Sequence, residues 1–328
     1  MQKIGITTTI PSEVLLAAGY TPIDLNNLYI NAPNRDALVK RAEKDGFPIN
    51  TCTWIKGIYG AIVEQGIQRV ICVATGDCSN TEMLMEVLRL KDIDGVPFYY
   101  PPQPSEDKML LALESLAYHL GTTLKEAENI REKLLPVRKN LKELDKLTYQ
   151  SGQVSGYENH IWQVSSSDFN GHYKKFATEL VQFLKQAKAR AASKTKLRLG
   201  FIGVPPVYAA SLYNHIEEYG AQVVFNETQR QFAMPYEASN LAKQYSLYTY
   251  PYNTCLKIDD INRQIEERQL NGIIHYVQTF CHRGISDIIY RQKLNCPILT
   301  LEGNDSYVLS LHQATRIEAF LDILLLQN

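Results

Sequence analysis

Two pairs of cysteines stand at matching places in the two halves of the sequence. Cys52 and Cys78 are 26 residues apart, Cys255 and Cys281 have the same separation, and the second pair follows the first by 203 residues. The later cysteine of each pair closely follows a short apolar, β-branched run that predicts a buried strand, over 69–75 and 272–279. Open α/β sheets bind ligands beyond the carboxyl ends of their strands. The spacing therefore predicts thiolates at two such edges.

Not every cysteine fits this pattern. Cys72 lies inside the apolar run VICVA, and Cys296 lies where the strand of LNCPILTL begins. Cysteine is among the most buried residue types, so we expect both to be core residues. Cys255, in YNTCLK, is intermediate, because only the repeated spacing argues for a function.

The sequence excludes several kinds of site. Neither half contains G-x-G-x-x-G or G-x-x-x-x-G-K-S/T, so we do not expect this chain to bind ATP or NAD. No C-x-x-C pair is present, which disfavours a zinc ribbon or a redox dithiol. Three well-separated thiolates at strand ends, from Cys52, Cys78 and Cys281, would suit a [4Fe-4S] cluster. One iron would then stay open to a substrate oxygen, a hydroxide or a bridging sulfide.

Composition favours a soluble protein of two domains. The 328 residues are 45% hydrophobic and 21% charged, which is enough for two sizeable cores. The net charge of −1 gives no reason to expect nucleic acid or an anionic membrane as a partner. No apolar run could span a bilayer, and MQKIGITTT lacks the features of a signal peptide. We expect a cytoplasmic protein whose cysteines do not form disulfides.

A strand, helix, strand pattern occurs twice. KIGITTT predicts a strand, SEVLLAAG a helix with Ser12 as N-cap and Gly19 as its end, and TPIDLN a second strand. The pattern returns as LRLGFIGVPP, a helix closed by Gly220, and AQVVFNE. The sequence thus predicts an α/β fold with two units related by internal duplication.

Helices are expected to begin beside the functional cysteines. Cys52 opens TWIKGIYGAIVEQG, where the helix dipole favours a thiolate. Ser79, Asn80 and Glu82 suit a helix start after Cys78, and Ser286 with Asp287 suit one after Cys281.

The expected domains are 1–104, 105–195 and 196–328. The first and last are α/β domains, and the middle segment is almost wholly helical, with apolar residues at helical spacing between charges. Its charged faces are expected to be solvated. His160 and Trp162, in the loop between two of its helices, either line a pocket or pack at a helix junction.

Three stretches resemble the 2-hydroxyacyl-CoA dehydratase and benzoyl-CoA reductase family, of the 2-hydroxyglutaryl-CoA dehydratase D-component type. CTWIKG is similar to the family's C-S-F-V-K-G segment, and GDCSNTE to its T-T-C-D segment. QTFCHRGISDII, CPILTLEGN and TRIEAF resemble its final region, F-C-H, P-V-L-x-L-E-G-D and T-R-x-E-A-F. With GYTPIDL, GVPP and EEYGAQVVFNE, the resemblance covers most of the chain.

The resemblance implies two flavodoxin-like or Rossmann-like parallel-sheet domains with an oxygen-sensitive iron-sulfur cluster between them. It carries the cluster ligands over to Cys52, Cys78 and Cys281. It also implies an ATP-hydrolysing activator that contains a cluster itself and donates one low-potential electron. A ketyl radical of the acyl-CoA substrate then expels the 2-hydroxyl group.

The family's branches leave alternatives open. Benzoyl-CoA reductases inject an electron into an aromatic ring, and double-cubane proteins are homodimers that reduce small molecules with an [8Fe-9S] cluster. A double cubane needs further thiolates, for which Cys255 is the fourth candidate and Cys72 and Cys296 are distant ones. GDCSN replaces the commoner C-D-G, and Asn304 displaces Asp305 by one position. These departures leave the identity of the substrate open. The sequence also does not decide between a homodimer and a heterodimer with a related subunit.

Several neighbours of the cysteines are candidate site residues. Lys56 could offset cluster charge or meet the activator, or could be merely solvated. His282 and Arg283 could donate hydrogen bonds to sulfides or substrate, although a packed histidine is the alternative. Glu82 and Glu302 could transfer protons, and Glu82 could equally be a helix cap.

The leading hypothesis is a cluster-bearing dehydratase or reductase subunit with an ATP-dependent activator. One alternative is a non-catalytic iron-sulfur electron-transfer or cluster-maturation scaffold. Another is a degenerate paralogue that keeps its cysteines while side chains fill its substrate pocket.

Overall fold

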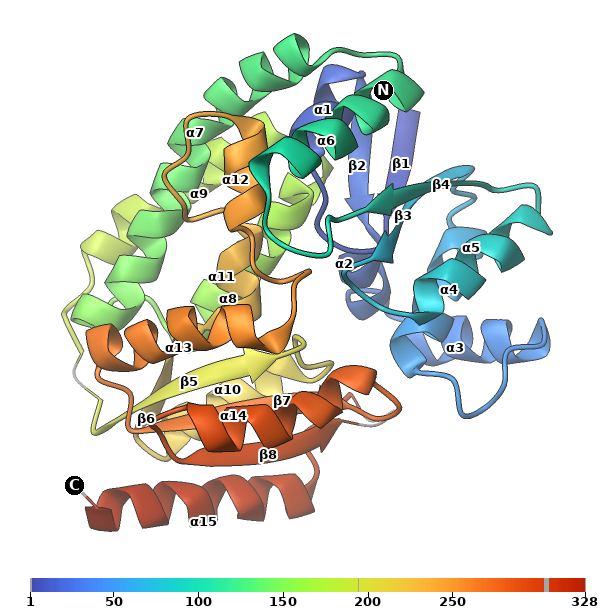
Figure 1. Cartoon of the computed structure of the whole chain (residues 1–328). Coiled ribbons are helices and arrows are strands. Elements are labelled where there is room, and N and C mark those ends of the chain that lie inside the picture. The colour runs from blue at the N-terminus through green and yellow to red at the C-terminus, as the bar shows by residue number, and fades with distance from the viewer. Residues whose placement is uncertain (1, 194, 304–306, 328) are drawn as a thin grey trace. The chain divides into compact units, whose positions relative to one another are not determined.

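The computed structural model describes residues 2–193, 195–303 and 307–327 and contains two parallel four-stranded sheets (Figure 1). The first has the order β2-β1-β3-β4 and the second the order β6-β5-β7-β8, so the two sheets have the same topology. This confirms the expected α/β fold with two similar domains. The strands are β1 (Gln2–Ile6), β2 (Tyr20–Asp24), β3 (Arg69–Thr75), β4 (Asp94–Tyr99), β5 (Leu197–Gly203), β6 (Ala221–Asn226), β7 (Gly272–Gln278) and β8 (Ile298–Gly303).

Each sheet belongs to one compact unit, and the chain passes between the units several times. Unit 1 comprises Met1–Lys139, Ser165–Glu179 and Met234–Tyr252, and unit 2 comprises Asn140–Val164, Leu180–Ala233 and Asn253–Asn328. Residues of the expected helical segment 105–195 belong to both units. The predicted boundaries after residues 104 and 195 stay a prediction.

Unit 1 has its core around the central strand β3. Side chains of α4 and α5 pack with Cys72 and Val70 of this strand, and Tyr59, Ile62 and Leu88 are almost wholly buried there. Its helices are α1 (Ser12–Ala17), α2 (Leu25–Ile30), α3 (Arg35–Lys44), α4 (Thr53–Glu64), α5 (Asn80–Arg89), α6 (Glu106–Leu120) and α12 (Leu241–Leu247).

The first helix corrects one expected cap. Ser12 is the first residue of α1, and Pro11 occupies the N-cap position without a side-chain hydrogen bond. Proline fixes φ near the helical value, here −61°, so the chain enters the helix without a serine cap. Gly19 has a φ of +80° just after the helix, as expected for its end.

Unit 2 is built around β7, all seven residues of which are buried. Its helices are α8 (Gly156–Val164), α10 (Ala209–Glu218), α11 (Glu227–Phe232), α13 (Thr254–Arg268), α14 (Asp287–Lys293) and α15 (Leu311–Gln327). α7 (Leu124–Lys146) and α9 (Tyr173–Lys188) contribute residues to both units. No helix among the described residues is both long and apolar enough to cross a membrane.

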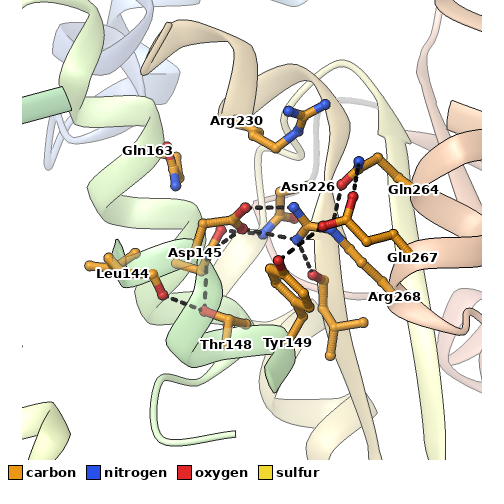
Figure 2. A network of polar contacts seen from close by, with 12 residues as sticks. Leu144, Asp145, Thr148, Tyr149, Gln163, Asn226, Arg230, Gln264, Glu267 and Arg268 are labelled. Carbon is orange, nitrogen blue, oxygen red and sulfur yellow. Dashed lines mark hydrogen bonds and ion pairs between the residues drawn. The ribbon is translucent and has the colours of Figure 1, made fainter. Parts of the chain in front are cut away.

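A buried polar network holds the helices of unit 2 on its sheet (Figure 2). The guanidinium of Arg268, on α13, makes two bonds to the carboxylate of Asp145, at 3.0 and 2.5 Å, and donates to the carbonyl oxygen of Val224 in β6. Asn159, on α8, donates to the same carboxylate. Burial raises the pKa of Asp145, but the Arg268 guanidinium outweighs this and holds it below its usual value.

Candidate functional site

Cys78 lies in the loop beyond the carboxyl end of the central strand of unit 1. β3 ends at Thr75, and α5 begins two residues after Cys78, with Ser79 at its N-cap. Gly76 has a φ of +103°, and a Cβ atom placed on it would lie 2.7 Å from Cβ of Pro251. The loop is therefore tightly packed, while the Cys78 side chain is half-buried.

Cys52 lies in the same unit at the start of α4. It is the N-cap residue, its side chain is 7% exposed, and its carbonyl oxygen accepts hydrogen bonds from the amides of Ile55 and Lys56. This confirms the helix start predicted at Cys52. The helix dipole and the unsatisfied amides of the first turn favour a thiolate at this position.

Lys56 is not solvated, which corrects that alternative. Its side chain is 1% exposed, and Nζ donates to Glu43 on α3 at 2.7 Å and to the carbonyl oxygen of Ile49 at 3.0 Å. A lysine four residues into an amphipathic helix can point to the buried side, and here a carboxylate compensates the charge. Lys56 thereby anchors the loop that leads to Cys52.

Cys281 follows the equivalent strand of unit 2. β7 ends at Gln278, whose carbonyl oxygen accepts from the Cys281 amide, and Cys281 then begins a short 3-10 helix, His282–Ser286. Phe280 has a φ of +64° and is 62% exposed. A bulky residue in this region costs about 1–3 kcal/mol, and such strain gathers at functional sites. The strained residue directly precedes the candidate ligand.

The neighbours of Cys281 are only partly buried. His282 is exposed, so the packed-histidine alternative does not hold, and Arg283 is half-buried. Glu302 is exposed on β8, while its carbonyl oxygen accepts from Gln313.

Two further features of the sequence concern Glu82 and the residues Asn304 and Asp305. Glu82 is exposed in the first turn of α5, a position suited to capping and compatible with proton transfer. Asn304 and Asp305 lie outside the described residues.

Cys72 and Cys296 are core cysteines, as expected. Cys72 is fully buried in β3, and Cys296 packs into the core of unit 2 with its thiol directed to the carbonyl oxygen of Leu270. Burial raises the pKa of each thiol to about 12. Neither side chain lies beyond the carboxyl end of a strand, where open α/β sheets bind ligands.

Cys255 is exposed, in contrast to Cys52. It is the second residue of α13, whose N-cap Asn253 accepts from the amide of Leu256. α4 and α13 lead into the equivalent strands β3 and β7, so the repeated spacing of the cysteines reflects the repeated topology.

Sequence reasoning missed an acid-base pair in unit 2. His275, buried in β7, has Nδ1 2.7 Å from Oδ1 of Asp287, and Thr300 and Arg291 also donate to that carboxylate. Burial is the main reason that the pKa of His275 is lowered. The histidine interrupts the apolar run GIIHYVQ, which was the only signal in the sequence.

A short polar helix was also missed. α11, with the sequence ETQRQF, is buried along its length, and Glu227 accepts from Thr228 and Gln231.

His160 on α8 contacts Tyr213 and Gln229, and burial lowers its pKa to about 3. His160 is therefore a neutral packing histidine.

Trp162 packs against Phe183, with ring centroids 5.4 Å apart. Two described cavities lie away from the candidate thiols. One of about 680 Å³ in unit 1 is bordered by Asp24, Asp168 and the end of α4, and one of about 320 Å³ in unit 2 by Glu158 and Arg190. Neither is lined by a cysteine.

The candidate ligands are divided between the units. Cys52 and Cys78 belong to unit 1 and Cys281 to unit 2. Within the described chain, no set of three His, Cys, Asp or Glu side chains is arranged to hold a metal ion. The six cysteines form no disulfide. Three thiols at strand or helix ends are nevertheless a donor set that fits an iron-sulfur cluster.

Comparison with known families gives the same assignment. A model of the 2-hydroxyglutaryl-CoA dehydratase D-component matches residues 7–324, which is nearly the whole chain. No curated protein matches the sequence. Together with the two parallel sheets of equal topology, this match shows that the chain belongs to the 2-hydroxyglutaryl-CoA dehydratase D-component family and is a dehydratase-type subunit.

Proposed function

We propose that this chain is the iron-sulfur subunit of a 2-hydroxyacyl-CoA dehydratase-like enzyme and holds a [4Fe-4S] cluster through Cys52, Cys78 and Cys281. The observation that carries this proposal is the contrast among the cysteines. Cys52 lies at a helix start and Cys78 and Cys281 follow strand ends, whereas Cys72 lies within β3 and Cys296 precedes the amino end of β8.

The bound cluster would supply one-electron transfer at low potential. An ATP-hydrolysing iron-sulfur activator protein would provide the electron, which the thioester carbonyl of a 2-hydroxyacyl-CoA accepts to form a ketyl radical. The radical would expel the 2-hydroxyl group as hydroxide, and loss of a proton from C3 would complete the elimination of water. Loss of water is redox-neutral overall, so the electron has to return after each turnover.

Side chains of this protein would assist at both edges. Lys56 keeps the loop before Cys52 in place through Ile49. His282 and Arg283 flank Cys281 and carry donors suited to a sulfide or a substrate oxygen. Glu302 is a candidate for proton transfer because its exposed carboxylate lies near the end of β8.

A second candidate function is a double-cubane reductase of small molecules, formed by a homodimer. The observation that favours it is Cys255, an exposed thiol on the helix of unit 2 that corresponds to α4. It would provide the fourth ligand of an [8Fe-9S] cluster. The first candidate allows a homodimer or a heterodimer with a related subunit, and we propose a cytoplasmic location for either.

Iron and acid-labile sulfide per chain, measured on anaerobically purified protein, test the ligand set. We expect about four irons, lost in Cys52→Ser, Cys78→Ser and Cys281→Ser and retained in Cys255→Ser. Cys296→Ala is the matched control, because it removes a thiol that packs in the core. About eight irons that also require Cys255 would favour the double cubane. Absence of iron after reconstitution would refute both candidates.

Turnover distinguishes an enzyme from a scaffold. Protein with its cluster is mixed with activator, ATP, a reductant and a 2-hydroxyacyl-CoA, and the enoyl-CoA product is measured. Product that depends on the activator and on Cys281 supports the dehydratase. A stable cluster without product from acyl-CoA or small oxidants would indicate an electron-transfer scaffold or a degenerate paralogue.

A further inference from the structure

The loop that carries Cys78 is held by a distant stretch of the same unit. The hydroxyl of Tyr250 donates to Oδ1 of Asp77, with 2.9 Å between the two oxygens. Asp77 directly precedes Cys78, and 173 residues separate it from Tyr250 along the chain. The hydrogen bond is therefore a tertiary contact made beside a candidate ligand.

A second contact lies next to the first. Gly76 has a φ of +103°, and a Cβ atom on it would come within 2.7 Å of Cβ of Pro251 and 3.1 Å of Cβ of Tyr100. Adjacent residues of one segment thus meet adjacent residues of the other. This pairing leaves the loop little room for another conformation.

The contact is partly buried. Tyr250 is 7% exposed, and its ring stacks on Tyr248 with centroids 6.0 Å apart. Burial raises the pKa of Tyr248, and the negative charge of Asp77 raises it further, so the carboxylate lies close to this tyrosine cluster. A hydrogen bond to a charged acceptor is roughly twice as strong as a neutral one, and a low dielectric strengthens it further.

We infer that Tyr250 is a positioning residue which, through Asp77, fixes the loop presenting Cys78 and sets the electrostatic surroundings of that thiolate. The inference rests on the proposed function for its second part, since it assumes that Cys78 binds a cluster. Its first part concerns the loop alone and holds for the protein without iron.

The two partners have opposite effects on a bound cluster. Asp77→Asn removes a negative charge one residue from a ligand, so reduction becomes easier and the midpoint potential shifts to a more positive value. Tyr250→Phe removes the donor that offsets this charge, so the potential shifts to a more negative value. A purely structural role predicts no such opposition.

Tyr252→Phe is a matched control for Tyr250→Phe. Tyr252 lies two residues away in the same segment, is 4% exposed, and its hydroxyl has no hydrogen-bond partner among the described residues. The two variants therefore lose the same atom from equally buried rings of one segment. Only one of them loses the bond to the Cys78 loop.

The first measurement is the alkylation rate of Cys78 in iron-free protein, followed by mass spectrometry. We expect Tyr250→Phe to raise the rate by up to about tenfold, which corresponds to about 1.4 kcal/mol in loop opening, and Tyr252→Phe to leave it unchanged. Equal rates in all three proteins would overturn the inference, whether or not a cluster binds.

The second measurement is a redox titration of the reconstituted protein followed by electron paramagnetic resonance. Opposite shifts for Asp77→Asn and Tyr250→Phe, with none for Tyr252→Phe, support the inference. Unchanged potentials in a protein that holds its cluster would overturn only the electrostatic part of this inference. Failure of the wild-type protein to bind iron would instead overturn the proposed function and that part with it.

Discussion

The two units share one sheet topology but differ at the edges that carry the cysteines. Both have the same strand order, and α7 contributes to a buried arginine-carboxylate pair in each, through Arg138 with Glu13 in unit 1 and Asp145 with Arg268 in unit 2. At the edges, unit 1 buries Cys52 behind an anchored loop, whereas unit 2 exposes Cys255. Each unit thus has a buried ion pair that involves α7, while the cysteines at the two equivalent helix starts differ in exposure.

The largest expected effect concerns the buried arginine-carboxylate pair of unit 2. Arg268→Met leaves the buried Asp145 carboxylate without its cation and should lower the free energy of unfolding by about 3–5 kcal/mol. Urea unfolding measures it. Arg263→Met is the control, since its side chain is 69% exposed and its partner Asp260 keeps the buried cation Arg230, so we expect less than about 1 kcal/mol. If Arg268→Met loses as little free energy of unfolding as Arg263→Met, the buried Arg268–Asp145 pair does not stabilise unit 2.

Arg138→Met tests the same feature in unit 1. Glu13 is fully buried and also accepts from Tyr245 and Gln244, so we expect a loss of about 3 kcal/mol. Burial raises the pKa of Glu13, but Arg138 together with the hydrogen bonds from Tyr245 and Gln244 outweighs it and holds the folded pKa below 4.5. The stabilisation that ionised Glu13 gives the wild-type protein is thus fully present above pH 4.5. It is lost as the pH falls through the lower pKa of Glu13 in the folded state. Urea unfolding at a series of pH values should show this loss of stability in acid. If the same pH dependence is found in Arg138→Met, the ion pair of Arg138 with Glu13 is not its cause.

A smaller effect is expected at the edge of unit 1. Lys56→Met removes the cation that binds Glu43 and the carbonyl oxygen of Ile49, and should cost about 1–3 kcal/mol, because Glu43 is partly solvated. We also expect faster alkylation of Cys52 in iron-free protein. Lys40→Met, at an exposed position of α3, provides the comparison. No change in either measurement would show that the loop before Cys52 does not depend on Lys56.

The last effect appears only as a pH dependence and concerns a carboxyl pair of unit 1. Burial and the nearby charge of Asp24 raise the pKa of Asp168 from 3.8 to about 7. The unfolded chain therefore ionises first as the pH rises from about 4 to 7, and the free energy of unfolding falls over that range.

Asp168→Asn should reduce this dependence. We expect the variant to gain about 2–3 kcal/mol relative to wild type at pH 8 compared with pH 5, given the rise of the Asp168 pKa on folding. Thermal unfolding at the two pH values measures the difference. An equal effect of the substitution at both would mean that Asp168 is ionised throughout.

Local patterns in the sequence were sufficient for most of the fold. The β-branched runs gave the strands, and the expected helix starts at Cys52, Ser79 and Ser286 agree with the structure. The core positions of Cys72 and Cys296 also followed from their apolar neighbours. These features depend on residues close in the sequence, which is why periodicity and capping patterns can indicate them.

The partners of polar side chains could not be predicted in this way. Lys56 was expected to be a surface or site residue, and only the fold supplies Glu43 to compensate it in the interior. Asp145 and Arg268 are 123 residues apart, and Asp77 and Tyr250 are 173 apart. Each residue alone is compatible with a solvated surface, so no local pattern distinguishes it.

The sequence by itself determined the strands, the duplication, the thiols at strand ends and the family. The tertiary structure decided that Cys52 is buried and Cys255 exposed, which cation is buried and which tyrosine holds the loop of Cys78. The physical reason is that hydrophobic periodicity is a short-range property, whereas burying a charge or a hydroxyl depends on a partner that only the folded chain brings near.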